Sequence, residues 1–328
     1  MSAATSAQLT ALRTGAALCT PDSRFLVRAR GADVLPWLER LLSMSVVDLT
    51  AGHLVRAMLM DGKGKLRMDL RVIATGPPTE GLFLDLPLVE KQKALHLLNM
   101  YVITEDVSIA DLSTELRSAS ILGPESAGVL RSLNIEPPGD GCVSMPRSDV
   151  YVMPTTLSAL PGYDLFFDET VGRDLLEEAL AAGAVRTESS ALQVARVAAG
   201  VPWFANDLSN DIIPLEANLD EHVSTSKGCY PGQEVMARIL NLGQIARRLM
   251  RLEASGAHDV APGTELASNE GKTAGVLTSI AYDPSTDTTY ALGFVKRPFW
   301  GEGSRLTASA SEFSVRDTAG GQPPSSES

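Results

Sequence analysis

The segment from Ser226 to Arg238 carries an unusual set of side chains that can do chemistry. Within Lys227–Glu234 it places a lysine, a thiol, a phenol, an amide and a carboxylate. Two glycines and a proline, at positions 228, 231 and 232, favour a tight turn in the same stretch. A turn that only reverses the chain has little need for so many polar groups, so the segment is a candidate functional loop.

The residues after this turn predict a short helix from Gln233 to Leu240. Glu234 would lie in its first turn and could pair with Arg238 four residues on. Cys229 would then precede a helix N-terminus and lie two residues from Lys227, and both features favour a thiolate. We therefore predict a reactive, partly exposed thiol at Cys229. The alternative is a small buried hydrophobe in a turn.

The elements that must position this loop alternate between strands and helices. Residues 24–29, 54–60 and 65–73 alternate like strands, and Asp61–Gly64 is typical of a hairpin turn. Short strands between Gly, Pro and Asp turns follow Gly243 and predict a small antiparallel barrel. No G-x-G-x-x-G motif follows a strand, so a dinucleotide-binding unit has no support. The pattern predicts an α+β fold with antiparallel sheets.

The length of 328 residues suggests several subdomains. We expect a partly disordered leader at 1–22, a two-lobed α+β region at 23–244, a barrel at 245–316 and a disordered tail at 317–328.

The bulk composition describes a soluble globular protein, with 44% hydrophobic and 21% charged residues. A net charge of −12 argues against a nucleic-acid groove, because a phosphate backbone would be repelled. No apolar run approaches a membrane span, and residues 1–17 lack the pattern of a signal peptide. Three scattered cysteines and four unpaired histidines predict no metal site. We expect a cytoplasmic protein with neither nucleic acid nor membrane as a partner.

Several segments resemble one known family, three of them most specifically. Lys-Gly-Cys-Tyr-x-Gly-Gln-Glu, followed by x-x-Ala-Arg in Lys227–Arg238, resembles the signature of the YgfZ-type folate-binding proteins. These proteins are a branch of the aminomethyltransferase (glycine cleavage T-protein) superfamily that includes iron–sulfur cluster assembly factors. Arg196–Pro202 and Pro214–Leu219 are similar to two further segments of the family. One departure is Ala198, where the aminomethyltransferases often have Glu.

The resemblance covers the chain from about Phe25 to about Ala308. It implies a three-lobed ring of aminomethyltransferase type, whose central hole holds tetrahydrofolate non-covalently, plus the C-terminal barrel. Glu216 is the candidate for the pterin ring, because one carboxylate can accept from both its 2-amino group and its N3–H. The alternative for Glu216 is a surface acid in a turn.

The other expected folate contacts follow from the same resemblance. Trp203 and Tyr230 are candidate apolar surfaces, or else core residues. Lys63, Lys65 or Arg238 could meet the acidic tail, although lysines in a turn are often only solvated. The motif itself adds three further expected folate-binding residues, which are Lys227, Gln233 and Glu234.

Two functions are compatible with these residues. The first is a folate-binding accessory protein that supports assembly or repair of iron–sulfur enzymes, with Cys229 as the catalytic thiol and iron–sulfur proteins or their assembly machinery as partners. The second is an aminomethyltransferase that moves a one-carbon unit from a lipoyl-carried amine to tetrahydrofolate, with Asp61, Asp85 or Asp111 as its acid. The thiol-bearing turn favours the first, because transferases of the superfamily carry a different sequence there. A scaffold that has lost its ligand is a third possibility.

Overall fold

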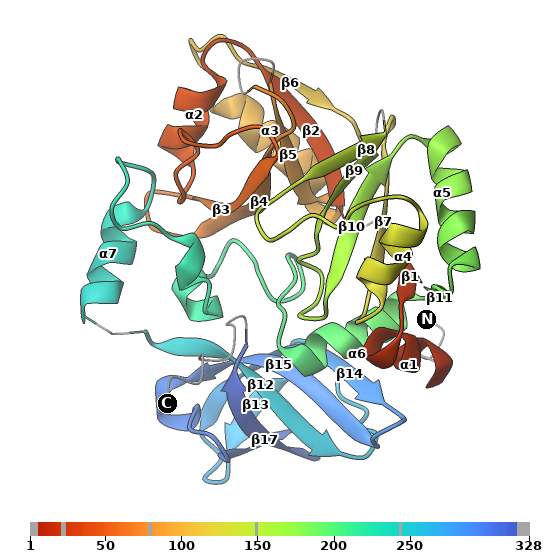
Figure 1. The fold of residues 1–328 in the computed structure, drawn as a ribbon. Helices are drawn as coiled ribbons and strands as arrows, with labels where there is room; N and C mark the ends of the chain where they lie inside the picture. Colours follow the sequence, from red (N-terminus) through yellow and green to blue (C-terminus); the bar gives the residue numbers. More distant parts are fainter. Residues whose placement is uncertain (1–5, 21–23, 78–80, 148–149, 243–244, 320–328) are drawn as a thin grey trace, which may run out of the picture.

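The structure of the protein is a computed structural model that describes residues 6–20, 24–77, 81–147, 150–242 and 245–319. Figure 1 shows three bodies around a common centre: two sheets covered by helices, and a small barrel. The expected α+β class with antiparallel sheets and a C-terminal barrel is confirmed. Within these ranges, no helix is long and apolar enough to cross a membrane.

The first sheet, at the top of Figure 1, has five antiparallel strands. Their order is β3 (His53–Met60), β4 (Leu66–Ala74), β5 (Leu82–Pro87), β2 (Arg24–Arg30) and β6 (Ser108–Asp111). Because side chains alternate across a strand, one face is apolar and packs against two helices. These are α2 (Val34–Leu41) and α3 (Lys91–Met100), the latter preceded by the 3-10 helix η2 (Leu88–Glu90). The other face is turned toward the second sheet and the barrel.

The second sheet has six strands and is antiparallel except for its β1–β11 pair. Their order is β11 (Val185–Thr187), β1 (Ala17–Cys19), β7 (Arg117–Leu122), β10 (Gly162–Phe167), β9 (Val150–Pro154) and β8 (Ser144–Arg147). One face packs against α4 (Ser126–Ser132) and α5 (Glu169–Ala181). The other packs against α1 (Ser6–Thr14) and α6 (Ser189–Ala199). Helix α6 ends at Gly200, whose φ of 79° suits a left-handed cap.

The third body is a closed six-stranded barrel. Its strands, in order, are β12 (Arg247–Ser255), β15 (Thr288–Lys296), β14 (Thr273–Asp283), β13 (Glu265–Ser268), β16 (Arg305–Ala308) and β17 (Ser311–Thr318). The 3-10 helix η5 (Arg297–Phe299) follows β15. The segment that joins α6 to the barrel contains η3 (Pro214–Ala217), η4 (Asp220–His222) and α7 (Gln233–Leu242). It packs in one core with the β3–β4 hairpin and the barrel.

Residues 6–20 of the expected leader at 1–22 are folded in the structure. Leu9 and Leu12 of α1 are buried, and β1 pairs with β7 on one side and β11 on the other. An isolated segment of small residues gives little local signal, whereas burial against α6 and a place inside a sheet supply the stabilisation. Residues 1–5 and 21–23 lie outside the described residues.

The chain remains folded slightly beyond the predicted end of the barrel at residue 316. Strand β17 ends at Thr318, and the buried Ala319 donates its N–H to the Leu249 carbonyl. Residues 320–328 of the predicted tail lie outside the described residues.

Candidate functional site

One strand of the first sheet supplies the charged centre of the molecule. In β4, Met68, Leu70 and Val72 face the helices, so the alternate residues face the second sheet and the barrel. Two of these are Asp69 and Arg71, and both are buried. Charged residues are almost never fully buried unless they are paired, so this face must be matched by partners.

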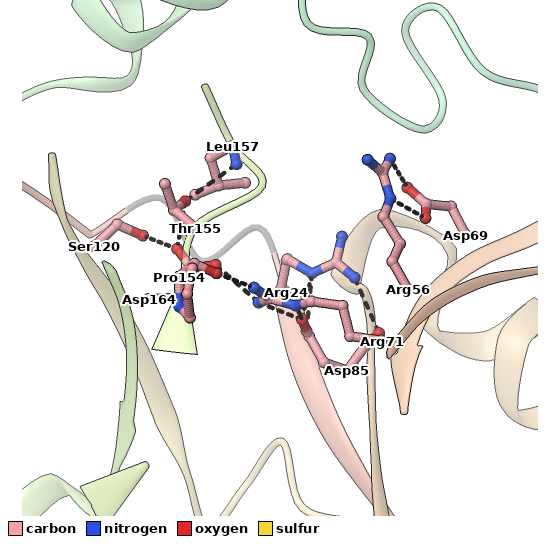
Figure 2. Close-up of polar contacts among 10 residues, drawn as sticks. All are labelled: Arg24, Arg56, Asp69, Arg71, Asp85, Ser120, Pro154, Thr155, Leu157 and Asp164. Carbon is pink, nitrogen blue, oxygen red and sulfur yellow. Dashed lines mark hydrogen bonds and ion pairs between the residues drawn. The ribbon is translucent and has the colours of Figure 1, made fainter. Parts of the chain in front are cut away.

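The partners of Arg71 come from both sheets, as Figure 2 shows. Arg71 donates from Nε to Asp85 at 2.5 Å and from Nη2 to Asp164, on β10 of the second sheet, at 2.8 Å. Its Nη1 donates to the Pro154 carbonyl at 2.7 Å. Burial alone would lower the pKa of Arg71, but the two carboxylates outweigh that effect and raise it. The guanidinium is therefore a charged link between the sheets.

The remaining acceptors of this network are also occupied. Arg24 donates from Nε to both oxygens of Asp85, at 2.8 and 2.9 Å. Asp164 accepts from the hydroxyls of Ser120 and Thr155 at 2.7 and 2.8 Å. Two arginines thus balance two aspartates, which satisfies the condition for burying charge.

A cavity of about 340 Å³ lies beside this network. Arg24, Arg56 and Asp69 supply its charged groups. Its other lining residues come from the end of β5 and η2, from the loop after β9 and from the loop after α6; they are Pro87, Leu88, Val89, Thr156, Leu157, Pro202, Trp203, Phe204 and Asn206. The lining therefore combines a small charged cluster with a largely apolar and aromatic wall, as is typical of ligand pockets.

Asp69 is the carboxylate of this cavity. It accepts two hydrogen bonds from Arg56, from Nε and Nη2, each at 2.9 Å (Figure 2). Burial would raise the pKa of Asp69, but Arg56 outweighs it and lowers the pKa to about 2. Each oxygen uses one lone pair for Arg56, so the ionised group can still accept hydrogen bonds from a ligand.

His222 lies on the far side of Arg56, with its Nε2 3.5 Å from Arg56 Nη1. Burial and the charge of Arg56 together lower the pKa of His222 to about 4. The imidazole is therefore neutral near pH 7. The three side chains form a row in which one anion and one cation are paired beside an uncharged ring.

The aromatic wall is fixed by a second buried ion pair. Arg196 of α6 donates from Nη1 to Asp207 at 2.8 Å, and Asp207 also accepts the Trp203 backbone N–H at 3.0 Å. The guanidinium lies over the Trp203 ring, 4.6 Å from its centroid, and the indole N–H donates to the Leu157 carbonyl at 2.9 Å. Trp203 thus has one defined orientation, and of the predicted folate-binding residues it is the one that lines the cavity.

A second cavity of about 240 Å³ adjoins the first, and the two share Pro87 and Phe204. Its floor is apolar, whereas its charged and polar groups come from β4, η2, α3 and the loop after α6. The remaining lining residues are Arg67, Met68, Glu90, Lys93, Ala94, His96, Leu97 and Asn210. The two cavities therefore offer space for an elongated ligand.

Glu216, expected to bind the pterin ring, is not among the described lining residues of either cavity. Its two oxygens accept from Arg247 at 3.1 and 3.2 Å, and Oε2 also accepts the Ile213 N–H at 3.2 Å. The structure therefore gives Glu216 a role in joining η3 to the first strand of the barrel.

The polar side chains of the candidate loop mostly build the loop itself. Lys227 donates from Nζ to the carbonyls of Glu39, Leu42 and Met44 at 2.7, 2.9 and 3.0 Å, so it caps the C-terminus of α2. Tyr230 donates its hydroxyl proton to the Ser224 carbonyl. The Lys227 contacts tie the loop to the first lobe, and the Tyr230 bond closes the loop on its own segment.

The rest of the loop points outward. Gln233 donates to the Lys227 carbonyl at 3.2 Å, whereas Glu234 and Arg238 are exposed on α7. The expected ion pair between Glu234 and Arg238 is wrong, since neither side chain has a salt-bridge partner among the described residues. Cys229 is exposed at the tip. The ammonium of Lys227 is directed at the C-terminal end of α2.

The other sequence candidates are also engaged elsewhere. Asp61 accepts the backbone N–H groups of Lys63 and Lys65 and pairs with Arg67, so it shapes the hairpin turn. Lys65 itself donates to the Asp211 carbonyl. Of the other two acids considered, Asp85 belongs to the buried network and Asp111 pairs with Lys91 on α3.

Sequence reasoning missed Asp69 and Arg56. A signal for Asp69 was present in the sequence, because Arg67, Asp69 and Arg71 alternate with the apolar residues of a strand. An exposed charged face would look the same in sequence, and only the covering second sheet and barrel turn these residues into buried groups.

The pKa of His222 generates a testable pH dependence. Its folded-state pKa of about 4 lies below the ordinary value of 6.5, so the unfolded chain binds more protons between these values. The stability supplied by the neutral ring is present above pH 6.5 and is lost as the pH falls toward 4. Between pH 7 and pH 4, we expect the unfolding free energy of the wild type to fall by about 3 kcal/mol more than that of His222→Gln.

Urea unfolding of both proteins between pH 7 and pH 4 measures this difference. His258→Gln, at a partly exposed position of the barrel, is the matched control and should follow the wild type. Parallel pH profiles for the wild type and His222→Gln would show that the ring is not held neutral by its surroundings.

Comparison with known proteins places this architecture in a family. The chain matches the GCVT N-terminal domain family over residues 1–227. A chloroplastic protein of Arabidopsis thaliana is 29% identical over 227 residues, which are 66% of this chain and 51% of that protein, so the match spans about half of the relative. The tRNA-modifying protein YgfZ of Yersinia enterocolitica is 27% identical over 279 residues, with 82% of each protein covered.

A solved structure shares the fold over nearly the whole chain. The glycine cleavage system aminomethyltransferase T from Bartonella henselae gives a TM-score of 0.84 at 20% identity, covering 95% of this chain and 88% of that one. The family match itself extends over both helix-covered sheets. This chain belongs to the GCVT N-terminal domain family.

Proposed function

We propose that this protein binds tetrahydrofolate in the cavity beside Asp69 and acts as an accessory protein for the assembly or repair of iron–sulfur enzymes. The observation that carries the folate part is an ionised carboxylate, Asp69, in a cavity with an aromatic wall. Membership of the GCVT family and similarity to a YgfZ protein support the same ligand class.

The residues of the two cavities fit the three parts of a folate. A pterin ring presents its 2-amino group and N3–H side by side, and one carboxylate with free lone pairs, as in Asp69, can accept from both. Trp203 and Phe204 offer aromatic surface to the flat rings. Arg67 and Lys93 of the second cavity offer positive charge to the carboxylates of the tail.

This assignment moves the proposed pterin contact from Glu216 to Asp69. Glu216 already pairs with Arg247, whereas Asp69 lines the cavity. Bound tetrahydrofolate would supply nitrogen atoms that carry one-carbon units. The protein's own part is to orient the pterin at Asp69 and to exclude water from it with the wall that contains Trp203.

The thiol of Cys229 is proposed to act toward a partner protein. It is exposed on a loop that Lys227 fixes to the first lobe, and it is absent from the described lining of both cavities. A thiol on an ordered, accessible loop can meet an iron–sulfur protein or its assembly machinery without disturbing the bound folate. The name of the Yersinia relative refers to tRNA modification; with a net charge of −12, this chain would take part in such a process indirectly.

An aminomethyltransferase activity is the second candidate, and Asp69 is the observation in its favour. An acid beside the one-carbon-carrying nitrogens of folate is what such a transfer requires. Asp69 meets that requirement better than Asp61, Asp85 or Asp111, each of which is engaged outside the cavity lining. Formation of methylenetetrahydrofolate from an aminomethylated lipoyl protein would favour this activity over the accessory role.

Matched amide substitutions test the folate site. Asp69→Asn should weaken tetrahydrofolate binding by about 10- to 100-fold, because a hydrogen bond to a charged acceptor is lost. Glu216→Gln makes the same chemical change outside the cavity and should leave the affinity unchanged. Isothermal titration calorimetry under anaerobic conditions measures both, with circular dichroism to confirm that each variant is folded. If Glu216→Gln weakened tetrahydrofolate binding and Asp69→Asn did not, Glu216 and not Asp69 would be the pterin contact.

A cysteine substitution tests the separate role of the thiol. Cys229→Ser should bind tetrahydrofolate like the wild type, yet fail to restore the activity of iron–sulfur enzymes in cells that lack the protein. Cys142→Ser is the control, because it removes a thiol at a partly buried position outside the loop. Full restoration by Cys229→Ser would remove the thiol from the proposed mechanism.

A further inference from the structure

One guanidinium nitrogen of Arg24, at the Asp69 cavity, has no partner among the described residues. The other two are fixed, because Nε donates to both carboxylate oxygens of Asp85 at 2.8 and 2.9 Å and Nη2 donates to the Asp85 carbonyl at 2.9 Å (Figure 2). Arg24 lines the cavity, and its side chain is only 10% exposed. A largely buried charged donor without an acceptor is costly, so a ligand that supplies an acceptor for Nη1 would be stabilised.

This donor lies close to the carboxylate of the cavity. Burial raises the pKa of Asp69, whereas the charge of Arg56 and, less strongly, that of Arg24 lower it. Arg56 also lines the cavity, but it uses Nε and Nη2 for Asp69 and its Nη1 lies 3.5 Å from His222. A ligand would therefore meet an anionic acceptor, Asp69, with one cationic donor, Nη1 of Arg24, beside it.

We propose that Arg24 selects the 4-oxo form of the pterin ring by donating a hydrogen bond from Nη1 to the O4 atom. The inference rests on the proposed function, because it takes the pterin to lie at Asp69. The 2-amino group, N3–H and O4 follow one another along one edge of the ring, so two donors adjoin one acceptor. Asp69 can match the donors, and Arg24 can match the acceptor.

The chemistry of the guanidinium makes this contact selective. Arginine has five donors and no acceptor, so a 4-amino group in place of O4 would set two donors against each other. The hydroxyl of Thr156 and the amide of Asn206, which also line the cavity, can each present a donor or an acceptor. They would therefore accommodate either ring, whereas Arg24 would accept only the oxo form.

Two ligands that differ at the 4-position provide the test. The affinities of tetrahydrofolate and of its 4-amino analogue, tetrahydroaminopterin, are measured by anaerobic calorimetry at pH 8 on the wild type and Arg24→Lys. The wild type should bind tetrahydrofolate about 10- to 100-fold more tightly. Arg24→Lys keeps a cation for Asp85 but lacks the Nη1 donor, so it should lower this ratio by about five- to tenfold, through weaker binding of tetrahydrofolate alone.

The change in the ratio isolates Arg24, because the 4-amino analogue also lacks the N3–H that Asp69 would accept. Arg247→Lys makes the same substitution at an ion pair outside both cavities and should leave the ratio unchanged. A variant that merely distorts the cavity would weaken both ligands equally. An unchanged ratio in Arg24→Lys, or wild-type binding of the 4-amino analogue as tight as that of tetrahydrofolate, would overturn this inference while leaving the folate site intact. Binding of neither ligand by the wild type would overturn the proposed function and the inference with it.

Discussion

One buried guanidinium, that of Arg71, joins the two sheets on which the rest of the structure depends. It lies between Asp85 of its own sheet and Asp164 of the other, at 2.5 and 2.8 Å, and its side chain is 1% exposed. Burying such charges is costly, and removing one partner of a buried pair typically costs about 3–5 kcal/mol. The relative position of the two lobes is therefore fixed by charge as well as by the apolar contacts around Phe166.

The ion-pair network around Arg71 also holds part of the cavity wall in place. Arg24 belongs to the charged network and also lines the cavity. Thr155 donates to Asp164 and directly precedes two residues of the cavity wall. Asp69 lies on the same strand face as Arg71, so the network that orients this face also directs the carboxylate. Under the proposed function, stability and ligand recognition share residues of this face, and a ligand would meet a site that is already formed.

Much of the fold was predictable from sequence, because alternation in residues 65–73 and the turn-rich composition after Gly243 are local signals. The site was not, because its groups come from separate elements. Lys227 shows the difficulty: its carbonyl partners lie 183 to 188 residues earlier in the chain, so its role as the cap of α2 has no local signature. Asp69 could be placed on the charged face of a strand, but not beside Trp203, which reaches the cavity from the loop after α6.

A crystal structure of the protein with tetrahydrofolate would show whether Asp69 binds the pterin of a folate. We expect density for the pterin within hydrogen-bonding distance of the Asp69 carboxylate and against Trp203, with the tail directed toward Lys93. A pterin bound at Glu216, with the Arg247 pair broken, would contradict it. So would a folate that occupies the protein outside both cavities.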